Sequence, residues 1–207
     1  QALTLLQSFL KNHPEDDEAQ QFLLGLINQK NPQEALSKLD EMIEADPENY
    51  ELRFAKAALL DKNGDVEGSV KELNDIINED PQGINGNEAR VMLASYYASQ
   101  QDFKKARELA QAVLDVAPEE SGALLVRAKL DLMDEKYDQA VTDLRTVLRN
   151  SPDSDEAMIL LAQAYQRQGS DALAEDSFRQ ALAANPHNAT AAFTVAGLLV
   201  NENNYDK

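Results

Sequence analysis

The chain of 207 residues contains no cysteine and only eight glycines. Without cysteine, disulfides and thiolate zinc sites are excluded, and the compartment stays open because such a chain survives in either redox environment. No apolar run is long enough to cross a bilayer, so we expect no direct membrane insertion by this segment. The low glycine content and 43% hydrophobic residues predict a mostly helical chain.

Basic residues are scarce as well. The sequence has 19 Lys and Arg against 37 Asp and Glu, a net charge of −18. Residues 1–86 carry −11, residues 87–188 carry −6 and the tail carries −1, so no segment has a basic excess. Binding to nucleic acid or anionic lipid is therefore disfavoured. The acidity is explained by a solvated outer face, or alternatively it steers a basic partner toward the acidic amino-terminal half.

Catalytic signatures are lacking. The two histidines, His13 and His187, lie near opposite ends of the chain beside boundary prolines, and without cysteine they form neither a metal pair nor a nucleophile–base arrangement. There is no Gly-rich phosphate loop and no Gly-x-Ser-x-Gly elbow. The sequence predicts no catalytic residue, no cofactor and no metal site.

One segment imitates a calcium loop. Residues 61–72 place oxygen-bearing side chains at five of the positions that an EF-hand uses. However, Val66 stands where that loop needs glycine, and Gly68 where it usually has an aliphatic residue. Because the same segment also fits a turn between two helices, we favour the turn.

The prolines are periodic. Six of the seven recur at intervals of about 34 residues, a spacing typical of helical repeat arrays. Each of the six follows an amphipathic stretch: Pro14, Pro47, Pro81, Pro118, Pro152 and Pro186. Since proline cannot continue a helix, each marks the same event, a helix end followed by a turn. The chain is therefore a repeat array. The interval from Pro81 to Pro118 is longer, and its three extra residues fall within 82–87, where they lengthen the loop or the helix that follows.

Small residues recur at fixed places within this period. In residues 155–188, Ala162, Ala174 and Ala181 occupy the eighth, twentieth and twenty-seventh places, with large apolar residues such as Tyr165 and Phe178 between them. The small residues let two antiparallel helices approach closely. The same places hold Ala57, Ser69 and Ile76; Ala94, Ala106 and Val113; and Ala128, Ala140 and Val147.

This pattern resembles the tetratricopeptide repeat, a helix–turn–helix unit of about 34 residues. The resemblance covers essentially the whole chain. It implies an all-α fold: a right-handed α-solenoid, or superhelix, of antiparallel helix pairs with about twelve helices. Residues 1–207 then form a single array. Its complete repeats are 16–49, 50–86, 87–120, 121–154 and 155–188, with half repeats at 1–14 and 189–207.

Some units depart from the pattern. Arg127 and Asp131 replace apolar or aromatic residues of a first helix, and Lys56 does so in an earlier unit. We expect these units to pack less regularly.

The two ends resemble halves of repeats. Residues 1–14 read as a second helix without its first, and residues 189–207 as a first helix without its second. We therefore expect a piece of a longer protein whose open ends expose Val195, Leu198 and Leu199 and associate with one another.

The resemblance also implies a binding surface. In this family the second, fifth, ninth and twelfth places of each first helix line a concave groove. The fifth and ninth places hold Phe54, Ala58, Val91, Ser95, Leu125, Lys129, Ile159, Gln163 and Phe193. The combination of lysine and asparagine with which some members clamp a carboxylate tail is absent, so we expect a peptide anchored by apolar side chains. Alternatively, Val91 and Ile159 serve only to pack neighbouring first helices.

The expected function is that of a non-catalytic scaffold that binds a protein or peptide in this groove. The alternative is a targeting or regulatory segment of a larger enzyme. The units, rich in Ala, Gln and Leu, resemble long bacterial tetratricopeptide proteins of cell-envelope, secretion and exopolysaccharide systems. The sequence leaves the compartment, cytoplasm or periplasm, open.

Overall fold

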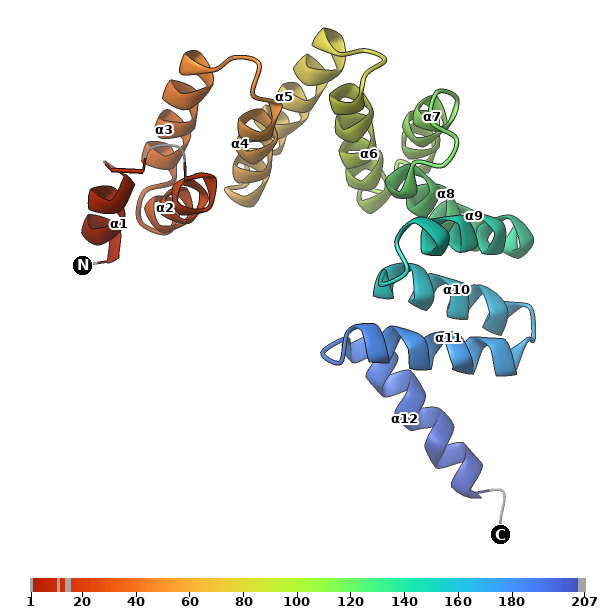
Figure 1. Cartoon of the computed structure of the whole chain (residues 1–207). Coiled ribbons are helices and arrows are strands. Elements are labelled where there is room, and N and C mark those ends of the chain that lie inside the picture. Colours follow the sequence, from red (N-terminus) through yellow and green to blue (C-terminus); the bar gives the residue numbers. More distant parts are fainter. Residues whose placement is uncertain (1, 11, 14–15, 205–207) are drawn as a thin grey trace. The chain divides into compact units, whose positions relative to one another are not determined.

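The computed structural model describes residues 2–10, 12–13 and 16–204, and within them no side chains of 2–4, 7, 17, 20–21 and 198–204. This described part forms twelve α-helices and no strand, which confirms the predicted all-α class (Figure 1). The helices are α1 (Ala2–Leu10), α2 (Asp17–Lys30), α3 (Pro32–Ala45), α4 (Tyr50–Lys62), α5 (Val66–Glu79), α6 (Ile84–Ser99), α7 (Phe103–Leu114), α8 (Ser121–Met133), α9 (Tyr137–Asn150), α10 (Asp155–Arg167), α11 (Asp171–Ala184) and α12 (Ala189–Asn204).

The chain divides into two compact units, Gln1–Ala89 and Arg90–Lys207. We call them the amino-terminal and carboxy-terminal units. In the amino-terminal unit each helix from α1 to α5 packs against the next. In the carboxy-terminal unit the same holds from α7 to α12, and the first helices α8 and α10 also contact each other.

The turn inside the helix pair has one geometry that recurs in four repeats, whereas α2 and α3 are joined by Asn31 alone, at φ −149°. The residue after the first helix's cap is left-handed in four repeats, with φ of +86° at Gly64, +63° at Gln101, +61° at Glu135 and +73° at Gly169. The next backbone N–H always donates to a carbonyl five residues back, as from Asp65 to Leu60 at 2.9 Å. This is a Schellman motif, which satisfies the free carbonyls at the end of a helix.

The turn between repeats depends on the periodic proline. The residue two places after the proline donates its N–H to the carbonyl of the residue before it, at 3.2 Å from Ser154 to Ser151 and at 3.0 Å from Asn188 to Asn185. The same side chain then caps the next helix, where Ser154 Oγ accepts from the N–H of Ala157 at 3.3 Å. One short segment therefore ends one helix and starts the next.

The repeat with the extra residues solves this cap differently. Gly83 stands at the capping place and has no side chain, so Asp80 accepts from the backbone N–H groups of Asn85 at 3.0 Å and Gly86 at 3.3 Å. A Cβ on Gly83 would lie only 1.9 Å from Asp80 Oδ1, so glycine is what makes room for this cap. The insertion lengthens the helix: α6 has 16 residues where α8 has 13.

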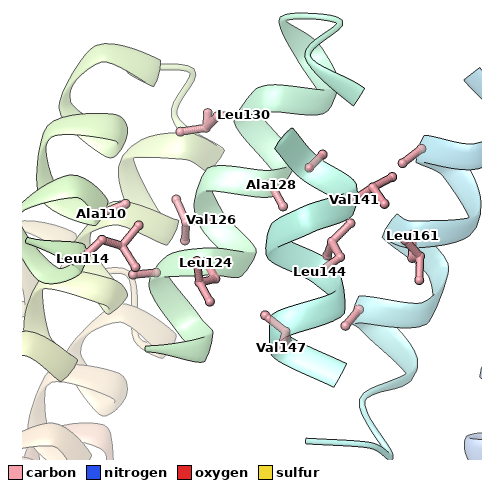
Figure 2. Close-up of a cluster of buried hydrophobic side chains, with 14 of the residues drawn as sticks. Ala110, Leu114, Leu124, Val126, Ala128, Leu130, Val141, Leu144, Val147 and Leu161 are labelled. Carbon is pink, nitrogen blue, oxygen red and sulfur yellow. The ribbon is translucent and has the colours of Figure 1, made fainter. Parts of the chain in front are cut away.

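The core lies along the helix seams. The small residues at the eighth place, Ala57, Ala94, Ala128 and Ala162, have no exposed surface. In the carboxy-terminal unit Ala94 and Ala128 belong to a continuous apolar cluster, of which Figure 2 shows Leu124, Leu144 and Val147. Because each repeat of this unit buries its apolar residues against the next, the core extends along the repeats of the carboxy-terminal unit.

Replacing the left-handed residues by glycine should stabilise the chain. Glycine adopts positive φ without the steric cost that Gln101 and Glu135 carry. We expect Glu135→Gly to raise the free energy of unfolding by about 0.5–1 kcal/mol, and Gly169→Ala to lower it by a similar amount. Urea unfolding of the three proteins measures this, and a destabilised Glu135→Gly would contradict the motif.

Enlarging the small seam residues should destabilise the chain. Ala162 is fully buried and Ala174 is 4% exposed, so a leucine at either place overpacks the helix pair. We expect Ala162→Leu or Ala174→Leu to cost about 1–3 kcal/mol. Ala183→Leu, on the exposed side of α11, is the matched control. Thermal unfolding in which both core variants behaved like this control would show that the seam is misplaced.

Candidate protein-binding face

The predicted lining residues lie on the first helices of the repeats. In the amino-terminal unit, α4 carries Phe54, which is half-buried, and Ala58, which is exposed. In the carboxy-terminal unit the lining residues come from α6, α8, α10 and α12. We call this second set, with the residues that pair with it, the first-helix face of the carboxy-terminal unit.

Three apolar residues of this face also pack against the core. Val91 and Leu125 lie against the main cluster, and Ile159 lies against two smaller clusters around α10, α11 and α12. All three are half-buried. Their outer surface alone is therefore free to meet a partner.

Phe193 differs from them. Its side chain is 80% exposed on α12, at the place equivalent to Leu125 and Ile159 in their repeats. The polar members Ser95 and Lys129 are exposed, and Gln163 is half-buried. The face thus combines an exposed aromatic side chain with half-buried aliphatic ones and polar groups.

An ion pair crosses the face. Lys129 Nζ on α8 lies 2.5 Å from Glu156 Oε1 on α10. Glu156 occupies the second place of its first helix, one of the inward places, but sequence reasoning did not select it. The pair shows that the second and ninth places of adjacent first helices meet on this face.

Val91 of α6 lies against the start of α8 on this face. A Cβ on Gly122 would lie 2.6 Å from Val91 Cγ1, so a side chain there would displace Val91. Gly122 is also at the second place of its helix. A small residue at this place lets the two first helices approach.

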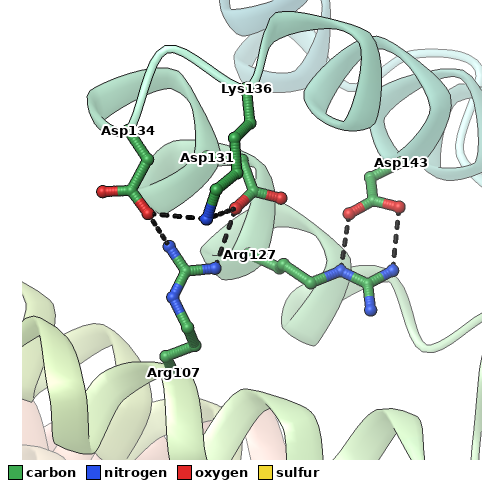
Figure 3. A network of polar contacts seen from close by, with 6 residues as sticks. All are labelled: Arg107, Arg127, Asp131, Asp134, Lys136 and Asp143. Atoms are coloured by element: carbon green, nitrogen blue, oxygen red, sulfur yellow. Dashed lines mark hydrogen bonds and ion pairs between the residues drawn. The ribbon is translucent and has the colours of Figure 1, made fainter.

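The opposite side of α8 carries charges. Arg127 follows Leu125 by two residues, about 200° around the helix. Its guanidinium donates two hydrogen bonds to Asp143 of α9, at 2.7 and 2.9 Å (Figure 3). These bonds raise the pKa of the Arg127 guanidinium. Arg127 departs from the repeat pattern, and for this reason irregular packing was predicted. The structure gives it a matched partner, the Asp143 carboxylate.

Asp131 is matched in the same way. Its carboxylate is 5% exposed and accepts from Arg107 of α7 at 2.8 Å, while Arg107 also reaches Asp134 at 2.9 Å. Lys136 adds a contact to Asp134 at 2.9 Å. Arg107, Asp131 and Lys136 also line a cleft of about 490 Å³ between α7, α8 and α9.

The amino-terminal unit contains a similar network, of which the sequence singled out only Lys56, as a departure from the repeat pattern. Arg53, 7% exposed, pairs with Glu72 at 2.7 Å and with Glu79. Lys56 reaches Asp40 at 2.7 Å and Glu72 at 3.4 Å. The partners come from α3 and α5, up to 26 residues from Arg53 along the chain.

Residues 61–72, the segment that resembles a calcium loop in sequence, form a turn between two helices. Helix α4 ends at Lys62 and α5 begins at Val66, so the ligand positions are distributed over two helices and a turn. Asp65 caps α5 by accepting from the N–H of Gly68 at 2.9 Å, and Glu72 is engaged by Arg53.

Among the described residues, no group of three or more His, Cys, Asp or Glu side chains is arranged to hold a metal ion. No helix in the same part of the chain has the length and apolar character needed to cross a membrane.

The expectation for the carboxy-terminal end is wrong in one respect. Val195 was expected to be exposed, but it is 7% exposed and packs with Ala162 and Phe178. It occupies the side of α12 that rests on the preceding repeat. The side chains of Leu198 and Leu199 lie outside the described residues.

The helix pairs, their repeated turns and their small seam residues define an α-solenoid, a protein built from stacked helix pairs. Models of the tetratricopeptide repeat match residues 26–88 and, in overlapping stretches, residues 91–133, 127–189 and 161–207. The chain therefore belongs to the tetratricopeptide-repeat family.

Solved structures share the fold at low sequence identity. Yeast Tom70 is similar with a TM-score of 0.80 and 17% identity over 97% of this chain and 43% of that chain. A thermophilic tetratricopeptide protein of Thermus thermophilus gives 0.60 and 20%, over 85% and 94%. YrrB, described as having an unusual peptide-binding site, gives 0.55 and 14%, over 91% and 96%. A search of curated proteins gave no match.

The buried ion pair should matter more for stability than its exposed neighbour. The Asp143 side chain is 10% exposed and that of Asp134 is 48% exposed. Asp143→Ala leaves Arg127 without its partner and should cost about 1–3 kcal/mol, whereas Asp134→Ala should cost clearly less because water solvates the groups that it leaves. Urea unfolding measures both, and replacing Arg127 and Asp143 together by leucine should recover most of the loss. Equal effects of the two single variants would contradict this account.

Proposed function

We propose that the chain is a non-catalytic scaffold that binds a peptide or a partner's segment on the first-helix face of the carboxy-terminal unit. The observation that carries the proposal is Phe193, an aromatic side chain 80% exposed at a lining place of the repeat. Aromatic side chains are the usual anchors of protein interfaces, and leaving one in water forgoes much of its transfer free energy.

The surroundings of Phe193 support this proposal. Leu125 and Ile159 stand at the equivalent places and are half-buried, so each offers a rigid apolar surface held by the core. Gln163 and Lys129 add hydrogen-bonding groups at the ninth places. An apolar floor with a few polar groups suits an extended or helical segment whose apolar side chains alternate with polar ones.

Two further considerations support the class of function. YrrB, of similar fold, has a peptide-binding site, and we extend peptide binding to this chain as part of the proposal. We infer a bacterial cell-envelope, secretion or exopolysaccharide assembly system as the setting. This inference rests on the composition of the repeats, which are rich in Ala, Gln and Leu.

Removing the aromatic anchor should weaken binding without unfolding the chain. Peptides selected from a displayed library on the intact chain provide the probe. Because Phe193 would become buried on binding, Phe193→Ala should raise the peptide Kd by about tenfold or more. Leu173→Ala is the matched control, since Leu173 is 49% exposed but lies on the second helix α11.

Isothermal calorimetry of the two variants decides the assignment, with circular dichroism to show that both remain folded. Peptides that lose affinity with Leu173→Ala and keep it with Phe193→Ala would place binding on the second helices instead.

A further inference from the structure

The ion pair between Lys129 and Glu156 lies within the surface that the proposed function uses. Lys129 is the only charged residue among the nine predicted lining residues. Its side chain is 44% exposed and that of Glu156 is 54% exposed. A partner on this face would therefore meet both charges.

Apolar residues flank the pair on the same side of each helix. Leu125 precedes Lys129 by four residues on α8, and Ile159 follows Glu156 by three on α10, which are spacings that share a helix face. The four side chains form one small patch with charges beside two apolar surfaces. A partner that covers Leu125 and Ile159 cannot avoid the ion pair.

The two members of the ion pair differ in how easily a charged group of a partner displaces them. Glu156 stands in the first turn of α10, where the helix dipole stabilises a carboxylate. Lys129 stands in the interior of α8 on a flexible stem, and its ammonium group is well hydrated when released. Displacing the Lys129 ammonium group from Glu156 costs little free energy, because the freed group is solvated by water.

A carboxylate of the partner that displaced Glu156 from Lys129 would lie among other acidic residues, which is less favourable than a cation bound to Glu156. The turns that lead into α8 and α10, together with the first turn of α10, carry five acidic residues: Glu119, Glu120, Asp153, Asp155 and Glu156. Of the basic residues near them, Arg149 is already paired with Glu119 at 2.8 Å. The carboxy-terminal unit as a whole has 12 basic and 18 acidic residues, a net charge of −6. This field attracts cations and repels anions.

We propose that the segment bound on this face is basic and amphipathic, and that one of its lysine or arginine side chains replaces Lys129 on Glu156. Apolar side chains beside that cation then cover Leu125 and Ile159. This inference rests on the proposed function and specifies the chemistry of the partner. In the free protein Lys129 neutralises Glu156, and on binding the partner's cation takes its place.

The test uses the intact chain and peptides selected on it from a random displayed library. The selected sequences should be enriched in lysine and arginine next to apolar residues. For a synthetic peptide of this kind, Glu156→Gln should weaken binding about two- to fivefold, the usual range for an exposed ion pair. Lys129→Gln should strengthen binding by a similar factor, because it removes the competitor for Glu156.

Glu119→Gln is the matched control, since Glu119 is exposed and forms the ion pair with Arg149 in the same unit. Because it removes one charge of the same acidic field but leaves the pair of Lys129 and Glu156 intact, it should weaken peptide binding clearly less than Glu156→Gln does. Replacing the peptide's cation by glutamine should lose the same factor as Glu156→Gln, with no further loss when both changes are combined. Raising the salt concentration should weaken binding of the parent protein more than that of Glu156→Gln.

Selected peptides that are acidic or indifferent in charge would overturn the inference, as would a Lys129→Gln variant that binds more weakly. If such peptides still require Phe193, the proposed function stands and only the basic partner is rejected. If no peptide is selected, or binding ignores Phe193, the proposed function fails and this inference fails with it.

Discussion

The close approach of two helices at small residues is the constraint on which the rest of the structure depends. At the eighth place of the first helix, Ala57, Ala94, Ala128 and Ala162 have no exposed surface. A larger side chain there would separate the helices and open space that the surrounding leucines and valines could not fill. In four of the repeats a left-handed residue brings the second helix back within a short turn, whereas Asn31 alone, in an extended conformation, joins α2 to α3.

Where the repeats depart from the apolar pattern, ion pairs replace apolar contacts between neighbouring helices. Arg127 and Asp131 on α8 stand where an apolar residue is usual, and each has a partner on a different helix, Asp143 on α9 and Arg107 on α7. An apolar contact accepts many neighbours, whereas a two-bond ion pair accepts only a carboxylate in the right place. These contacts therefore match α8 to its own neighbours and would not form with another repeat of the array.

The sequence predicts the periodic features well and the tertiary pairings poorly. The proline period and the recurring alanines located twelve helices and the insertion, because each depends on local chemistry that recurs in every repeat. The ion pairs were missed because nothing local says which of 37 acidic residues meets Arg53 or Lys129. The exposure of Val195 was predicted wrongly because this residue lies on the side of α12 that packs against α10 and α11. Only the orientation of α12 on the preceding repeat reveals which side that is. The left-handed Gln101 and Glu135 could have been found by aligning them with Gly64 and Gly169.

Helix α8 separates two kinds of ion pair on its opposite sides. Arg127 and Asp143 are held by two hydrogen bonds with the carboxylate 10% exposed, so opening this pair would leave a charge in a poorly solvated place. Lys129 and Glu156 are about half exposed, and water can solvate either one when they separate. The scaffold that we propose needs both properties, since its helices must stay together while the proposed binding face exchanges partners. The same helix can supply both because residues two apart in sequence face opposite directions, so stability and exchange are determined by different side chains.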